Sequence, residues 1–334
     1  MADWLMVMLL ERIVLVFLTT AAVMASAAVA FAAPLNPKDI AADSVTLLHV
    51  DCDAIRASTI GQWLLSEPAV QDKLASLGAT FDVDLTNQLH GITYYTTAGN
   101  SNDGVMVIAA DFEADHLLTK AQDLSDFSSA TNGSHVIYSW VDEHWKRRLG
   151  KSARVYGAIS GHHVVYGQNE SRLEDALDVL EGTKPNSEAG KEPLYIKPGQ
   201  QILLEALILK VDFPNARGPA AILQMCKSIY LKVSEANSNT TAAIHLETAD
   251  DDTATQVNTM FQGFLGMLKM QADDPNAAKF ANSITITRTN LEVGLTISMP
   301  SSEMIEVMKS GQEKAKQKRS NRRARDKDSQ QNDK

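Results

Sequence analysis

Three side chains near the start of the chain have types and a spacing that suit metal binding. His49, Asp51 and Asp53 are separated by one residue each. Residues two apart on a β-strand project from the same face, and an imidazole with two carboxylates suits a hard or borderline cation. The set therefore predicts a metal site, which would serve a metal-dependent hydrolase. Alternatively, Asp53 is the N-cap of a helix that starts at Ala54, since a cap needs only a side-chain oxygen.

A second candidate is an aromatic residue beside a short basic run. Trp145 is followed by Lys146, Arg147 and Arg148. An exposed indole ring next to cationic groups can stack on a sugar or hold a partner protein, so these four residues are a predicted binding site. The alternative is that Trp145 covers the end of a sheet, as part of an elaborated loop.

Familiar catalytic signatures are absent from the sequence. It contains no G-x-S-x-G, H-E-x-x-H, P-loop or C-x-x-C motif, and no Ser lies three residues before a Lys. We therefore expect no cofactor, and we favour a non-catalytic protein over an enzyme of unfamiliar type.

The elements that would position these residues alternate between strands and helices in residues 44–181. Paired strands separated by turn-rich segments indicate hairpins, and apolar residues at three- and four-residue spacing indicate helices. The predicted strands are 45–50, 92–97, 104–110, 135–141, 154–159 and 164–166. The predicted helices are 54–65, 68–77, 113–122 and 171–180.

A similar order of elements returns after a segment rich in Gly and Pro, residues 182–200, which we interpret as a linker. Residues 201–311 are predicted to hold helices at 206–209, 219–225, 254–271, 275–281 and 302–309, with strands at 228–233, 242–248, 283–289 and 291–299. The expected fold is therefore α+β, with two sheet-and-helix lobes of mostly antiparallel strands and helices packed on one face. The repeated order also raises the hypothesis of a diverged duplication.

The clearest single element is the helix at 254–271. Val257, Phe261, Phe264 and Leu268 belong to one apolar face. Gly263 and Gly266 disfavour a helix by about 1 kcal/mol each relative to Ala, and close packing against a sheet would explain them.

The first 32 residues resemble an export signal. An apolar run from Ile13 to Ala33 ends in small residues with two Ala-x-Ala patterns, and Pro34 follows. We expect cleavage after Ala32 and a periplasmic or secreted protein. The alternative is an uncleaved membrane anchor, because about 20 apolar residues are enough to span a bilayer.

Charge is distributed unevenly along the chain. The net charge is −10, yet residues 312–334 contain nine Lys and Arg against four Asp and Glu. An acidic body argues against nucleic-acid binding by the folded part. The tail is expected to be disordered, and it would either contact an anionic surface or only solubilise the chain.

The two cysteines, Cys52 and Cys226, have no spacing typical of a disulfide framework. Two buried thiols are the simpler interpretation, and a disulfide in an oxidising compartment is the alternative.

Several segments resemble a family of exported bacterial proteins of unknown function. They are 48–51, 55–62, 136–142, 154–158, 176–180, 256–271 and the two C-terminal strands. The resemblance extends from about Ser44 to Pro300. It implies the same α+β fold and leaves the function open. From the export signal, the large packed core and the lack of convergent reactive groups, we expect a non-catalytic binding or interaction protein of the cell envelope whose partner is a protein or a polymer.

Overall fold

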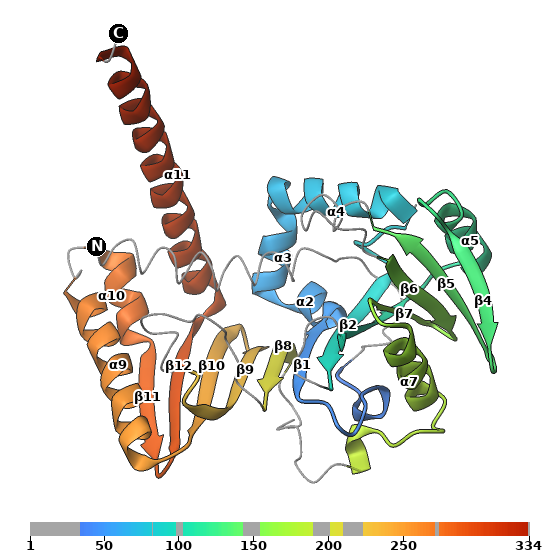
Figure 1. Ribbon diagram of the computed structural model, residues 1–334. Coiled ribbons are helices and arrows are strands. Elements are labelled where there is room, and N and C mark those ends of the chain that lie inside the picture. Colours follow the sequence, from blue (N-terminus) through green and yellow to red (C-terminus); the bar gives the residue numbers. More distant parts are fainter. Residues whose placement is uncertain are drawn as a thin grey trace.

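A computed structural model describes residues 34–81, 83–97, 103–142, 154–189, 201–209, 223–270 and 274–332 (Figure 1). Up to residue 189 its strands are β1 (Thr46–Asp51), β2 (Leu89–Thr96), β3 (Val105–Ala110), β4 (Ser128–Asn132), β5 (His135–Val141), β6 (Arg154–Ser160) and β7 (His163–Gly167). Its helices there are η1 (Pro37–Asp39), α2 (Cys52–Ala57), α3 (Thr59–Ser66), α4 (Pro68–Phe81), α5 (Ala114–Ala121), α7 (Glu170–Leu180) and η3 (Ser187–Ala189).

The remaining strands are β8 (Gln201–Ile208), β9 (Cys226–Ala236), β10 (Asn239–Thr248), β11 (Ile284–Thr289) and β12 (Glu292–Pro300). The remaining helices are α9 (Asp251–Lys269), α10 (Pro275–Asn282) and α11 (Ser301–Asn332). The α+β class is confirmed.

All the described strands belong to one antiparallel sheet in the order β11-β12-β10-β9-β8-β1-β2-β3-β7-β6-β5-β4. The predicted lobes are joined at the centre of this sheet, where Val50 of β1 is opposite Leu204 of β8. The prediction of two separate sheets is therefore wrong, because the first strand after the linker pairs with the first strand of the chain.

Helices cover both faces of the first half of the sheet rather than one face. Successive residues on β1 point to opposite faces, so Val50 joins a core with Trp63 of α3, whereas Leu47 joins a second core with Leu173 of α7. Figure 1 shows α2–α4 and α7 on opposite sides of strands β1–β3. The first core extends into the second half of the chain as far as Leu268 of α9, so the two halves share an interior as well as a sheet.

The helix predicted at 54–65 is divided into two. Ser58 ends α2 and caps α3, with its hydroxyl accepting a hydrogen bond from the Gly61 N–H. A Cβ on Gly61 would come within 1.9 Å of the Ile55 carbonyl oxygen, so this break requires glycine.

One carboxylate joins the two halves at this break. Glu235 of β9 is buried and accepts hydrogen bonds from the backbone N–H groups of Thr59 (2.7 Å) and Ile60 (3.1 Å). These are free N–H groups at the start of α3, where the helix dipole favours negative charge. Glu235 therefore completes the N-terminus of a helix that lies far from it in the sequence.

Two elements differ from the prediction in type. Residues 206–209 were predicted to be helical, yet residues 201–208 form strand β8, since pairing with β1 and β9 decides the state of a short apolar run. The edge strand β4 was not predicted. Its residues are all exposed, so they lack the apolar alternation of a half-buried strand.

The apolar face predicted for α9 is confirmed. Val257 is fully buried in a third core beside Leu246 of β10, and Phe261 packs against it. The explanation offered for the glycines is wrong, because a Cβ on Gly263 or Gly266 would meet nothing within 4 Å.

The tail is helical rather than disordered, since α11 continues to Asn332 and projects away from the sheet (Figure 1). Residues 312–332 contain no Pro or Gly and many Lys, Arg, Gln and Ala residues, which favour helix. Its sequence is polar throughout, which is also typical of a chain that does not fold.

The interpretation of the cysteines as buried thiols is confirmed. Neither forms a disulfide and both are buried, Cys52 in the first core and Cys226 in the third.

Candidate functional site

The structure separates the side chains of the predicted metal site. His49 is buried on β1, with its Nδ1 2.9 Å from the Thr93 hydroxyl. Asp51 caps α2 by accepting a hydrogen bond from the Ala54 N–H at 2.8 Å. The cap is therefore Asp51 and not Asp53, because α2 begins two residues earlier than predicted.

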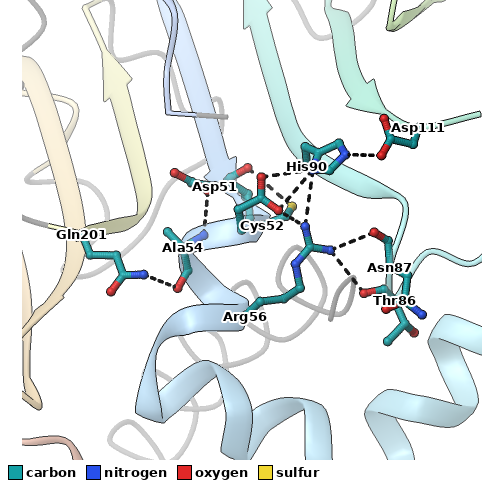
Figure 2. A network of polar contacts seen from close by, with 11 residues as sticks. Asp51, Cys52, Ala54, Arg56, Thr86, Asn87, His90, Asp111 and Gln201 are labelled. Carbon is teal, nitrogen blue, oxygen red and sulfur yellow. Dashed lines mark hydrogen bonds and ion pairs between the residues drawn. The ribbon is translucent and has the colours of Figure 1, made fainter. Parts of the chain in front are cut away.

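Asp53 belongs to an ion network at the first turn of α2 (Figure 2). Its carboxylate pairs with the Arg56 guanidinium and lies 3.1 Å from Nδ1 of His90 on β2. Arg56 also donates to the carbonyl oxygens of Thr86 and Asn87, both at 3.3 Å. The network thus connects α2 to β2 and to the segment that precedes it.

The other side of the His90 ring is close to a second carboxylate. Its Nε2 lies 3.0 Å from Oδ2 of Asp111, and this contact is an ion pair only when the ring is protonated. The contact does not have hydrogen-bond geometry, so Nε2 has no hydrogen-bond partner among the described residues. Figure 2 shows His90 between Arg56 and Asp111. Among the described residues, the polar contacts of the His90 ring are with Asp53, Arg56 and Asp111.

The predicted metal site is not formed. Among the described residues, no three His, Cys, Asp or Glu side chains are grouped to hold a metal ion. The reason is that His49 and Asp51 belong to strand β1, whereas Asp53 lies in the first turn of α2, where its carboxylate contacts Arg56 and His90.

Asp51 predicts an unusual pH dependence. Burial raises its pKa to about 6, against the hydrogen bond from Ala54 and the charge of Arg56, which lower it. A raised folded pKa means that ionisation costs stability as the pH rises from about 4 to 6. Because Asn caps helices as well as Asp, Asp51→Asn is expected to raise the free energy of unfolding by about 1–3 kcal/mol at pH 8 and by little at pH 4.

Urea denaturation at the two pH values measures this difference. Asp250→Asn is the control, because Asp250 caps α9 in the same way but its pKa is lowered by the hydrogen bonds from Thr253. A gain from Asp51→Asn that is equal at both pH values would contradict the argument.

Cys52 has no nucleophilic role in this site. Its thiol is fully buried and donates to the Val50 carbonyl oxygen at 3.6 Å. Burial and the neighbouring Asp51 raise the pKa of the thiol, so the reactive thiolate is disfavoured.

A pocket of about 300 Å³ lies on the opposite face of the sheet, beside α7. Its walls come from the segment between η1 and β1, the facing ends of β2 and β3, and α7 with the turn after it. The residues that line it are Ala41, Ala42, Asp43, Tyr95, Thr97, Asp103, Val105, Arg172, Asp175, Val179, Lys184 and Pro185.

Two hydroxyl groups in this pocket lack partners. The Tyr95 Oη and the Thr97 Oγ1 are buried, and neither has a hydrogen-bond partner in the described chain. Tyr95 is 2% exposed. Burial raises the pKa of its hydroxyl, and Asp175 and Asp43 raise it further. Tyr95 is itself one of the residues that line the pocket. Burying such a group without a partner costs about 1–3 kcal/mol.

The cations of the pocket are already paired. Asp175 accepts from Arg172 at 3.2 Å and from Lys184 at 2.6 Å, and Lys184 also pairs with Asp178 at 2.8 Å. Asp103 accepts a hydrogen bond from Asn169 at 2.9 Å.

Sequence reasoning missed this pocket. Its lining residues are spread from position 41 to position 185. In the sequence, Tyr95 looks like an ordinary apolar residue of strand β2. The predicted binding residues Trp145, Lys146, Arg147 and Arg148 lie outside the described residues, so that prediction stands as it was made.

Comparisons with known proteins give little further information. No protein-family model matches the chain, and no curated protein matches it. Among solved structures, it is similar to one titled "Structure of crystal form I of TP0453", with a TM-score of 0.43 and 10% identity over 84% of this chain and 98% of that chain. At this TM-score the likeness carries no argument about function.

Proposed function

We propose that the protein is an exported, non-catalytic binding protein of the cell envelope, and that it holds a small polar ligand in the pocket beside α7. The observation that carries the proposal is the buried hydroxyl of Tyr95, which has no hydrogen-bond partner among the described residues. Tyr95 lines the pocket together with Thr97, whose hydroxyl also lacks a partner there. A bound polar molecule would supply the missing hydrogen bonds and remove their cost. The pocket volume of about 300 Å³ is at the lower end of the range for small-molecule sites.

The groups with catalytic potential support binding rather than turnover. Asp53, Arg56 and His90 are engaged with one another, and the thiol of Cys52 is enclosed in the core. A general base must reach the proton that it removes, and the pocket lining includes no His or Cys.

The export part of the proposal rests on the apolar leader with its Ala-x-Ala patterns, which precedes the described residues. No helix in the described part of the chain is long and apolar enough to span a membrane. The basic residues of α11 and the run at 145–148 are the proposed contacts to an envelope polymer or protein. Anchoring by an uncleaved leader is the alternative location.

The experiment that tests the proposal compares retention with consumption. The purified full chain is incubated with the small-molecule fraction of its host's envelope, and bound and free compounds are quantified by mass spectrometry. A binding protein retains one compound unchanged in a ratio close to one per chain. Protein-dependent loss of a compound in molar excess would instead indicate an enzyme, and retention of nothing would overturn the proposed function.

A further inference from the structure

We infer that the ligand of the pocket beside α7 is a small organic amine, bound as its ammonium ion by Asp43, Asp103 and the Tyr95 hydroxyl. This inference rests on the proposed function and adds the chemical class of the ligand. It is carried by two independent features of the pocket, the balance of charge in its lining and the unpartnered hydroxyls of two lining residues, Tyr95 and Thr97.

The charges that line the pocket leave a negative excess. Both oxygens of Asp175 are engaged, one by Arg172 and one by Lys184, and Lys184 also neutralises Asp178. These four side chains form a balanced cluster. Asp43 and Asp103 remain, and among the described residues no basic side chain forms an ion pair with either of them. The pocket therefore attracts a cation and disfavours an anion.

The hydroxyls match an ammonium group in hydrogen-bonding capacity. An ammonium ion has three donors and no acceptor. The hydroxyls of Tyr95 and Thr97 can each accept one hydrogen bond, and neither gives or receives one within the described chain. The carboxylates of Asp43 and Asp103 supply the negative charge that an ammonium ion needs. Hydrogen bonds from the ammonium group to these carboxylates would be about twice as strong as hydrogen bonds between neutral groups. The apolar residues Val105 and Val179 line the same space and suit a short hydrocarbon chain.

The test uses three probes that have the same carbon skeleton and differ in charge. Isothermal titration calorimetry on the purified full chain compares 1,4-diaminobutane with butane-1,4-diol and with succinate. We expect the diamine to bind at least about tenfold more tightly than the diol, because a charge-assisted contact contributes about 1.5–3 kcal/mol and tenfold corresponds to about 1.4 kcal/mol. Succinate should show no binding.

Two substitutions assign the binding to this pocket. Asp43→Asn removes one carboxylate that forms no ion pair among the described residues, and should weaken diamine binding about tenfold. Tyr95→Phe removes only the hydroxyl, and should weaken binding by roughly two- to tenfold. It should not lower the melting temperature of the ligand-free protein, because it removes an unpartnered buried group. Tyr94→Phe is the matched control, since Tyr94 points to the opposite face of β2. The affinity of this variant for the diamine should equal that of the wild type.

The outcomes distinguish the class of the ligand from the existence of the binding site. Diamine binding that is weakened by Asp43→Asn and Tyr95→Phe but not by Tyr94→Phe supports the amine site. Tighter binding of the diol or succinate that depends on Tyr95 would overturn the amine class while leaving the proposed binding function intact. Absence of diamine binding, or binding that both variants leave unchanged, would overturn the site.

Discussion

Replacing Glu235 by Gln is expected to lower the free energy of unfolding by about 2–4 kcal/mol at pH 7. The carboxylate accepts from the Thr59 and Ile60 N–H groups and lies near the Thr240 hydroxyl, 3.5 Å away. A Gln side chain has a single oxygen, so at least one buried N–H would face an amide group that cannot accept. The charge that complements the dipole of α3 would also be lost.

The loss should depend on pH in a defined direction. Burial raises the pKa of Glu235, but hydrogen bonds from Thr59, Ile60 and Ser301 outweigh it, so the folded pKa is lower than the ordinary 4.5. A lowered folded pKa means that the stabilisation is fully present above pH 4.5 and is lost as the pH falls through the folded pKa. The difference between the wild type and Glu235→Gln should therefore shrink below about pH 4.

Urea denaturation followed by circular dichroism, at pH 7 and in steps down to pH 3, measures this effect. Glu247→Gln is the control, because Glu247 lies on the neighbouring strand β10 and its ion pair with Lys227 is exposed. That substitution should cost less than about 0.5 kcal/mol. If Glu235→Gln lowers the free energy of unfolding as little as the control does, the contact between the two halves of the chain does not depend on this carboxylate.

Replacing Arg56 by Met is expected to destabilise the protein by about 2–4 kcal/mol, because it leaves the carboxylate of Asp53 in the network without its cation. The two side chains are only 12% and 13% exposed. The carbonyl oxygens of Thr86 and Asn87 would also lose a charged donor (Figure 2). Because the residues act together, the double variant with Asp53→Asn should lose less than the sum of the two single variants.

Chemical denaturation of the four proteins in this cycle provides the measurement. Arg154→Met is the matched control, since Arg154 pairs with Asp126 at the surface, where the side chains are 35% and 67% exposed. We expect that control to lose less than about 1 kcal/mol. Equal losses at Arg56 and Arg154, or strictly additive effects at Arg56 and Asp53, would contradict a coupled network.

Local patterns predicted the individual elements of this fold well. The period of Val257, Phe261 and Leu268 predicted α9, and the alternation in 135–141 predicted β5. The joining of the halves was not predictable, because it depends on the pairing of β1 with β8, more than 150 residues apart in the chain. Residues 206–209 illustrate the same limit, since a short apolar run takes its state from its partners.

The candidate site was predicted only in part, and for a related reason. The sequence pointed to polar residues in the segment 49–53. The helix, however, begins two residues earlier than predicted, so Asp51 is its N-cap and Asp53 forms an ion pair with Arg56. The pocket brings together Asp43, Tyr95 and Asp175 through long-range packing. The Tyr95 hydroxyl lacks a hydrogen-bond partner only in the folded chain, so no sequence pattern could predict it.

Native mass spectrometry can show whether this protein carries a small ligand in the pocket beside α7. The samples are the protein and its Tyr95→Phe variant, both purified from the envelope of the host. We predict a wild-type chain that begins at Ala33 with one small amine bound, and a variant with markedly less of it. A wild-type chain that carries no small molecule, or equal loading of both proteins, would contradict the proposal.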